Sequence, residues 1–289
     1  MSSFAYARPE RLADVFGLWR DEPAARLLSG GTDLLVAIRK GRARPPLVID
    51  LKHVQELAPG ISEREGFLRI GASTVLSDMV ADARVRAAFP ALVEAALVVG
   101  SIQIRNRATL TGNLCNASPA ADTAPPLLVH DAVVEVTGPS GARRLTLDAF
   151  FVRPGRTALE RSELVSAIEL PIPERPSGGA FERMTRRRGV DLATVNLACA
   201  IGADGVTRLG FGAVGPRPLL AVDDSGVLAD PGASAEEQDA VLDRLAAVTS
   251  PISNVRASRE YREAMLIVLA RRALATARRR LEEARHAGR

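Results

Sequence analysis

The sequence predicts a two-domain protein built from both helices and strands, and three observations lead to this prediction. Its 289 residues suggest two or three domains at roughly 100–200 residues each. Strand-like and helix-like apolar patterns are interspersed in the first part, whereas three strand-like runs precede two helical segments in the last part. A linker rich in Pro and Gly, residues 171–179, separates the parts. We therefore expect domains over residues 1–175 and 176–289.

The first 55 residues contain a glycine loop between two short apolar runs. Apolar spacing predicts a helix over 9–20, strands over 25–28 and 47–50, and a helix over 34–39. The loop, Ser29-Gly30-Gly31-Thr32-Asp33, follows the first strand. Adjacent glycines let a backbone approach a ligand closely, and a helix start directs its amides at an anion. The loop is either an ordinary turn or a phosphate site, and it matches neither GxGxxG nor a Walker A loop.

The next segment predicts further strands and helices. We expect a helix to begin near Ser77, where Ser and Asp are suited to cap the first turn. The other predicted elements are strands over 67–71, 127–136 and 144–147, a helix over 90–99, and a hairpin turn at 138–141.

A second loop, from Gly100 to Asp122, has little periodicity and many small polar side chains. Connections of this length tend to be functional. Its Thr, Asn and Ser side chains can satisfy the loop backbone and leave N–H groups for a ligand. Asp122 is suited to accept from a ribose hydroxyl or an adenine amine. The alternative is a long ordered surface loop.

The last part predicts strands over 180–185, 194–202 and 206–214, and helices over 234–247 and 257–285. The final helix is amphipathic. Its predicted apolar face holds Tyr261, Met265, Val268 and Leu269, and the opposite side holds Arg271, Arg272, Arg278 and Arg279.

Composition excludes several classes of protein. No apolar run reaches the roughly 18 residues that span a bilayer, and the first residues lack the uninterrupted apolar segment of a secretory signal. We therefore expect a cytoplasmic protein with neither a signal peptide nor a membrane span. Two cysteines, Cys115 and Cys199, are too few for an iron–sulfur cluster with four thiolates. The three histidines are far apart in the sequence, which disfavours a metal site.

The positive charge is concentrated at the C-terminus. The chain has a net charge of +4, of which residues 271–289 contribute +5 through seven arginines and two glutamates. No aromatic residues are interleaved with these arginines, as a nucleic-acid stacking surface would require. We expect a solvated helix face or a subunit contact and no nucleic acid.

Four stretches, taken together, carry a family resemblance: LLSGGTDLL (27–35), QIRNRATLTGNLCNASPAADTAPPLL (103–128), AFERMTRRRGVDLATVN (180–196) and ASREYREAMLIVLARRAL (257–274). In this order they resemble the FAD-binding medium subunit of molybdenum hydroxylases, such as aerobic carbon monoxide dehydrogenase and xanthine dehydrogenase. The resemblance implies a PCMH/vanillyl-alcohol-oxidase-type FAD-binding fold of two subdomains, about residues 1–55 and 56–175. It also implies a C-terminal α+β domain of the CO dehydrogenase flavoprotein type.

The resemblance implies which residues bind FAD. Both loops would hold the pyrophosphate, with Val99 and Gly100 near the flavin. Asp122 would bind the adenosine or ribityl hydroxyls, and Val165 would contact the adenine side. The implied FAD-binding residues are Leu27, Leu28, Ser29, Gly30, Gly31, Thr32, Asp33, Leu34, Val99, Gly100, Thr109, Thr111, Gly112, Asn113, Asp122, Val165 and Arg183.

Two positions depart from the family pattern. Arg183 stands where many relatives have Lys near the flavin pyrimidine edge, and a cation there stabilises the reduced flavin. The resemblance makes Arg183 the candidate catalytic residue, and the alternative is a salt-bridged strand residue. Thr111 stands where the family usually has the first of two glycines. Its Cβ pushes the backbone from the phosphate, or its hydroxyl donates to it.

Other candidate residues have simpler interpretations. Cys115 beside the second loop is expected to be a small buried thiol, and Cys199 is expected in the core. His130 lies in a strand-like run and has no assigned role. Arg186, Arg187 and Arg188 pair either with a partner subunit or with Asp191.

The family role implies two partners in a hetero-oligomer: an iron–sulfur small subunit and a large subunit with the molybdenum cofactor. FAD would take electrons from the iron–sulfur subunit and deliver them to an acceptor such as a quinone, NAD or oxygen. Two alternatives stay open, a stand-alone FAD-dependent oxidase or dehydrogenase and a flavin-free assembly protein of the same fold.

Overall fold

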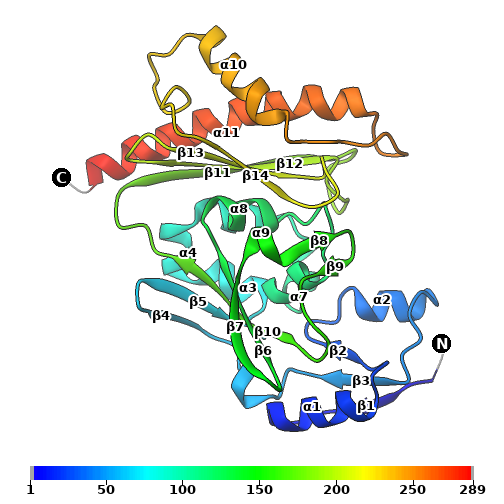
Figure 1. The fold of residues 1–289 in the computed structure, drawn as a ribbon. Coiled ribbons are helices and arrows are strands. Elements are labelled where there is room, and N and C mark those ends of the chain that lie inside the picture. Colours follow the sequence, from blue (N-terminus) through cyan, green and yellow to red (C-terminus); the bar gives the residue numbers. More distant parts are fainter. Residues whose placement is uncertain (1–2, 288–289) are drawn as a thin grey trace.

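A computed structural model describes residues 3–287, which form three stacked parts (Figure 1). The N-terminal part is a parallel sheet with the order β1 (Ala5–Ala7), β3 (Leu47–Asp50), β2 (Arg26–Leu28). Helix α1 (Leu12–Asp21) packs on one face around Val15 and Ile49, and α2 (Leu34–Arg39) packs on the other around Ile38 and Val48. The predicted strands and helices of this part are confirmed, although α1 begins three residues later than expected.

The central part is an antiparallel sheet of five strands covered by short helices. Its order is β4 (Ile61–Arg64), β5 (Phe67–Gly71), β10 (Leu164–Pro171), β6 (Val133–Gly138), β7 (Gly141–Thr146). The hairpin predicted at 138–141 joins β6 to β7 and is confirmed. The accompanying elements are η1 (Gln55–Leu57), α3 (Leu76–Ala81), α4 (Ala83–Ala88), α5 (Pro90–Leu97), α6 (Ile102–Arg105), α7 (Leu110–Cys115), α8 (Ala124–Val129), α9 (Leu147–Phe150), β8 (Phe151–Arg153) and β9 (Arg156–Thr157).

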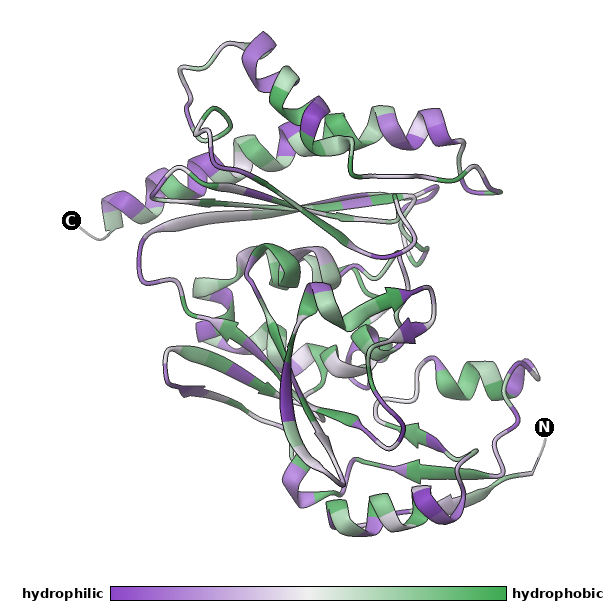
Figure 2. Cartoon of the chain, in the orientation of Figure 1, coloured by the Kyte–Doolittle hydropathy of each residue, from purple (hydrophilic) through white to green (hydrophobic). Residues whose placement is uncertain are grey.

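The C-terminal part is an antiparallel sheet with the order β11 (Ser177–Met184), β12 (Val195–Gly202), β13 (Thr207–Gly212), β14 (Leu219–Asp223). One face is covered by α11 (Arg259–Ala287), with α10 (Ala235–Ala246) beyond it, and the other face rests on α8 (Figure 1). Apolar residues follow the contacts between the sheet and these helices (Figure 2). Because both faces of β12 are covered, nearly all of its residues are buried, which explains its continuous apolar run.

The strand predicted over 127–136 is wrong in its first half. Residues 124–129 form α8, and only Val133–Gly138 is a strand. Pro125 and Pro126 occupy the first turn of α8, where a missing N–H costs no helical hydrogen bond. Every residue of α8 is buried, so the helix carries no amphipathic period that distinguishes it from a buried strand.

The predicted cap of α3 is also wrong. The helix follows Val75, which makes no side-chain cap, and the Leu76 amide donates to the Ala108 carbonyl at 2.8 Å. Ser77 instead donates to Asn106 Oδ1 at 2.5 Å. A contact with the second loop therefore replaces the local cap.

The buried face of α11 agrees in part with the predicted one. Leu269 is buried and Met265 packs against the core as predicted, whereas Tyr261 is exposed. The buried residues of the helix are Arg262, Leu266, Leu269, Ala270, Ala273, Leu274, Ala277 and Leu281. A Cβ on Gly178 of β11 would lie 1.9 Å from the Ala277 carbonyl oxygen. The helix lies so close to β11 that small residues are required where the two meet.

Six of the strands were not predicted: β1, β4, β8, β9, β10 and β14. The linker between the domains is shorter than expected, because β10 reaches Pro171 and β11 begins at Ser177. In the part of the chain that the structure describes, no helix combines the length and the apolar character needed to cross a membrane.

Candidate cofactor site

The two predicted loops meet in the structure. Ser29 Oγ and Thr109 Oγ1 form a hydrogen bond of 2.9 Å, although 80 positions separate them in the sequence. A Cβ on Gly30 would lie 2.2 Å from the Arg107 carbonyl oxygen and 2.8 Å from Ala108 Cα. Gly31 has a φ of +76°, a backbone conformation that favours glycine. Gly30 is therefore needed for the close approach of the two loops, and Gly31 is needed for the turn of the first loop.

The second loop contains two short helices, which corrects the prediction of an aperiodic stretch. Ser101 caps α6, and Thr109 caps α7 by accepting from the Gly112 amide at 3.0 Å. Short helices of four and six residues leave no periodic signal in the sequence. As a result, α7 begins where the two loops meet.

Thr111 lies in the first turn of α7. Its backbone is helical, so the position itself does not require the glycine that the family usually has. Its Oγ1 is buried and has no hydrogen-bond partner among the described residues. Because buried hydroxyls usually have a partner, this atom is suited to bind a group that the chain itself does not supply.

Asn113 connects the loops to the next functional residues. Its Oδ1 accepts from Thr123 Oγ1 at 2.7 Å, which holds Asp122 beside α7.

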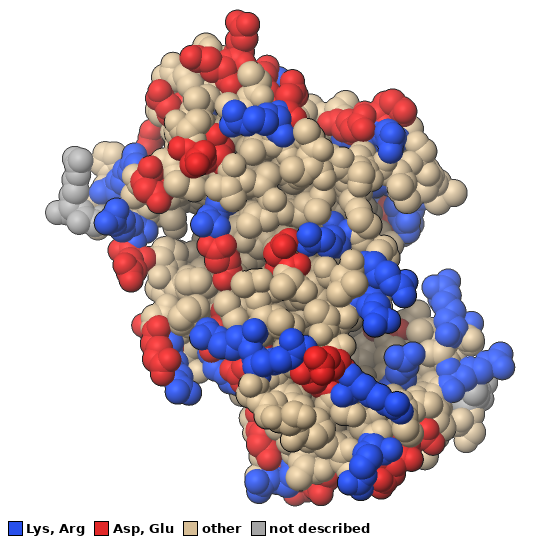
Figure 3. All heavy atoms as spheres, in the orientation of Figure 1, with Lys and Arg blue, Asp and Glu red and all other residues tan. Residues whose placement is uncertain are grey.

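Basic side chains lie on both sides of the hollow next to α2 (Figure 3). Such a distribution of charge favours an anion in the hollow.

Asp122 and Arg183 form a buried ion pair. Arg183 Nη1 lies 2.8 Å from Asp122 Oδ2, and the two side chains are 8% and 10% exposed. Asn196 Nδ2 donates to Asp122 Oδ1 at 2.7 Å, and Arg183 also donates to the Val98 and Asp191 carbonyls. Burial raises the pKa of Asp122 to about 6, although Arg183 and Asn196 favour its charged form.

The roles expected of these two residues toward FAD stay predictions, and the structure shows what holds their side chains. Arg183 is the salt-bridged strand residue that the alternative interpretation described, and Asp122 is engaged with it. Arg183 still lies beside the segment expected near the flavin, because Val98 directly precedes Val99 and Gly100. Asn196 was not predicted. Its only signal in the sequence is an amide in the apolar run of β12.

The remaining predicted residues lie in two environments. The side chains of Leu27, Leu28 and Leu34 pack in the N-terminal cores, so only their backbone is available at the loop. Val165 is a buried core residue of β10. Thr32 and Asp33 follow Gly31 at the start of α2, where Asp33 makes no side-chain cap.

Three other residues require separate description. Cys115 is exposed at the end of α7, so its prediction as a buried thiol is wrong, whereas Cys199 is in the core as predicted. His130 follows the end of α8 and is not in a strand. Among residues 3–287, no group of three or more His, Cys, Asp or Glu side chains is arranged to hold a metal ion.

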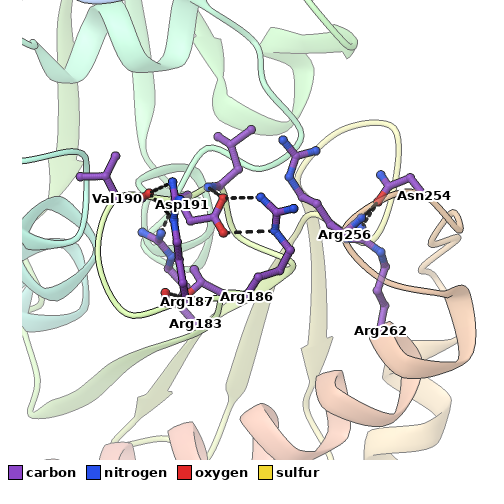
Figure 4. A network of polar contacts seen from close by, with 10 residues as sticks. Arg183, Arg186, Arg187, Val190, Asp191, Asn254, Arg256 and Arg262 are labelled. Carbon is purple, nitrogen blue, oxygen red and sulfur yellow. Dashed lines mark hydrogen bonds and ion pairs between the residues drawn. The ribbon is translucent and has the colours of Figure 1, made fainter.

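The loop between β11 and β12 is held by its own polar contacts (Figure 4). Two guanidinium nitrogens of Arg186 donate to the two carboxylate oxygens of Asp191, Nη2 to Oδ1 at 3.1 Å and Nε to Oδ2 at 3.2 Å. Arg187 donates to the Val190 carbonyl. The internal ion pair is therefore the interpretation that holds for Arg186.

Two glycine-containing loops that meet at the start of a helix form a site suited to a phosphate-bearing cofactor. Residues 2–173 match the family described as the FAD binding domain in molybdopterin dehydrogenase, and residues 179–277 match the CO dehydrogenase flavoprotein C-terminal domain. The chain belongs to this family of FAD-binding dehydrogenase subunits. The family resemblance and the α+β fold predicted from the sequence are confirmed.

Similar proteins cover nearly the whole chain. The putative xanthine dehydrogenase FAD-binding subunit of Escherichia coli is 31% identical over 96% of this chain and 97% of that protein. The carbon monoxide dehydrogenase medium chain of Afipia carboxidovorans is 31% identical over 96% of this chain and 98% of that protein.

Solved structures agree with these relatives. Reconstituted CO dehydrogenase from Oligotropha carboxidovorans matches with a TM-score of 0.89 at 31% identity, covering 96% of this chain and 99% of that chain. Quinoline 2-oxidoreductase from Pseudomonas putida 86 matches with a TM-score of 0.85 at 26% identity, covering 96% and 97%.

Proposed function

We propose that the chain binds FAD where its two loops meet and serves as the electron-transfer subunit of a molybdenum hydroxylase-type dehydrogenase. The contact between Ser29 and Thr109, with Gly30 closed against the backbone of Arg107, is the observation that supports this proposal most. Two backbone turns brought together beside a basic hollow suit a pyrophosphate. The unpartnered hydroxyl of Thr111 fits the same ligand.

The binding residues follow from this placement. The backbone of Ser29 to Asp33 and the start of α7, Thr109 to Asn113, would hold the pyrophosphate. The flanking Leu27, Leu28 and Leu34 shape the first loop from the core. Val99 and Gly100 would lie along the flavin, and Val165 supports the adenine side from β10.

Arg183 is the proposed catalytic residue in the sense that its charge acts on the flavin. FAD supplies the redox chemistry when it is bound, and the protein supplies position and electrostatics. Because Asp122 holds the guanidinium, the flavin would experience the charge of the pair and not of a free cation. Asp122 would then act mainly by positioning Arg183.

We propose that an iron–sulfur subunit donates electrons and that a large subunit with the molybdenum cofactor oxidises the substrate. This arrangement makes the chain one member of a cytoplasmic hetero-oligomer. We further propose that the domains divide within residues 172–176, between β10 and β11, with subdomains of about 1–55 and 56–175 in the first.

The test is a visible absorption spectrum of the full chain, titrated with FAD. We expect the bands of oxidised flavin to remain with the protein after gel filtration. If the protein stays colourless alone but takes up FAD in the presence of its partner subunits, the cofactor assignment stands. Failure to take up FAD in both conditions would contradict the proposal.

A further inference from the structure

An exposed apolar patch surrounds Arg183. It consists of Leu97, Val98, Ile102 and Ile104 from the end of α5 and α6, and Val190 and Leu192 from the loop between β11 and β12. Each side chain is 38–60% exposed. Scattered exposed apolar residues are ordinary, but a gathered set with a charged rim is typical of an interaction site.

Contacts through Arg183 show that these residues form one surface. The guanidinium donates to the Val98 carbonyl at 2.9 Å and also to the Asp191 carbonyl. Asp191 lies between Val190 and Leu192 and next to Arg183 (Figure 4). Arg183 therefore joins this loop to the end of α5. Ile104 packs against Gly100, where an added Cβ would lie 2.8 Å from Ile104 Cγ2.

The rim of this patch carries a net positive charge. Asp191 is paired with Arg186, and Asp122 is paired with Arg183. Arg187 and Arg105 contact only backbone carbonyls, and Arg188 makes no ion pair among the described residues. Three cations next to the patch are therefore without a carboxylate partner in this part of the chain.

We propose that this patch and its arginine rim are the docking surface for the iron–sulfur subunit. The inference rests on the proposed electron-transfer function, and it selects one of the two proposed partners. Electrons reach the flavin from this partner, so its surface must come close to Val99 and Gly100, which the patch adjoins. A cluster held by four thiolates is anionic, so a partner that carries it complements the unpaired arginines.

The experiment uses the full chain and its purified iron–sulfur subunit, with two readouts on each variant. Binding is measured by analytical ultracentrifugation at several salt concentrations, and flavin content is measured by the visible spectrum. Ile102→Glu should weaken binding at least tenfold, because it places a charge at the centre of the apolar patch. Arg188→Glu should weaken binding several-fold, with a smaller dependence on salt. Both variants should retain FAD.

Two matched controls separate this surface from a general effect of charge. Val222→Glu changes a comparably exposed valine on β14, at the opposite edge of the C-terminal sheet. Arg86→Glu reverses an exposed arginine on α4. Neither control should change binding of the iron–sulfur subunit.

Each other outcome overturns the proposal. Loss of FAD by Ile102→Glu with unchanged subunit binding would make the patch a flavin wall. Disruption of a homodimer with unchanged subunit binding would make it a contact between two copies of this chain. If Ile102→Glu loses both FAD and the iron–sulfur subunit, the result for Arg188→Glu decides between the two explanations. Unchanged binding of the iron–sulfur subunit by Arg188→Glu would reject the proposed docking surface. Absence of FAD from the wild-type complex would reject the proposed function, while subunit binding is still measured.

Discussion

Arg183 of β11 and Asp122 of the second loop form an ion pair, with 2.8 Å between Nη1 and Oδ2, that joins the C-terminal sheet to the central part of the chain. Asn196 holds the other carboxylate oxygen of Asp122, and Val98 accepts from Arg183. The cation next to the proposed flavin site is therefore fixed by groups from both sides. The C-terminal sheet therefore sets the position of the positive charge beside the proposed flavin site.

The two members of this pair should shift the flavin potential in opposite directions. Arg183→Ala is expected to lower the reduction potential, because the negative charge of the reduced flavin loses a nearby cation. Asp122→Asn removes the opposing carboxylate and should raise the potential. Both potentials are measured by redox titration of the FAD-loaded protein, and an unchanged potential in both variants would remove Arg183 from the catalytic role.

Stability provides the control for this pair. Removing one partner of a buried ion pair leaves an uncompensated charge and costs about 3 kcal/mol of unfolding free energy. Arg183→Lys keeps the charge and loses the planar fork, so it should lower the flavin reduction potential less than Arg183→Ala does. Thermal unfolding of each variant shows whether the potential was measured on a folded protein.

Gly30→Ala should separate the two loops. Its Cβ would meet the Arg107 carbonyl oxygen at 2.2 Å, and the backbone on both sides must shift. We expect a cost of about 1–3 kcal/mol from overpacking and at least tenfold weaker FAD binding, measured by titration of the visible spectrum.

Two other glycines test whether this effect is specific. Gly17 lies inside α1 with open space around its Cβ position, so Gly17→Ala should stabilise the protein by up to about 1 kcal/mol and leave FAD binding unchanged. Gly178→Ala should destabilise the C-terminal sheet against α11 but leave FAD binding intact. Equal loss of FAD in the Gly178 and Gly30 variants would show that general destabilisation is the cause.

Local signals predicted the elements whose neighbours are close in sequence. The strand, glycine loop and helix over 25–39 follow from turn chemistry and apolar spacing, and the structure has them at nearly those residues. The hairpin at 138–141 follows from the same kind of signal.

Long-range contacts account for the predictions that failed. The cap of α3 is a carbonyl of Ala108, 32 positions away from Leu76, so Ser77 carried a misleading local signal. The pair of Arg183 and Asp122 is separated by 61 positions and depends on how β11 lies over the second loop. The sequence pattern identified both residues as candidates, but it does not show that they contact each other.

Thr111→Val tests the unpartnered hydroxyl of α7. If the hydroxyl donates to bound FAD, its removal should weaken FAD binding by about 1 kcal/mol, roughly fivefold, with little effect on the protein without FAD. Thr111→Gly should not tighten binding, because the position is helical and glycine destabilises helices by about 1 kcal/mol. Tighter binding by the glycine variant would show that the Cβ obstructs the phosphate.

His130 should make the protein sensitive to acid. Burial lowers the pKa of His130 from the usual 6.5 to about 4, and its Nε2 has no partner among the described residues. Between these pH values the unfolded imidazole binds a proton that the folded one does not. The neutral imidazole therefore contributes its full share of the unfolding free energy above pH 6.5. This contribution is lost as the pH falls toward 4, by up to about 3 kcal/mol.

His130→Phe should remove this acid sensitivity. The ring packs edge-on against Phe89 with centroids 5.0 Å apart, and phenylalanine keeps that contact without titrating. We expect the unfolding free energy of the variant, measured by chemical denaturation, to vary less between pH 6.5 and 4 than that of the wild type. His286→Gln, which changes an exposed residue at the end of α11, should behave as the wild type. An equally steep loss of stability in His130→Phe would show that other groups, and not this imidazole, carry the acid response.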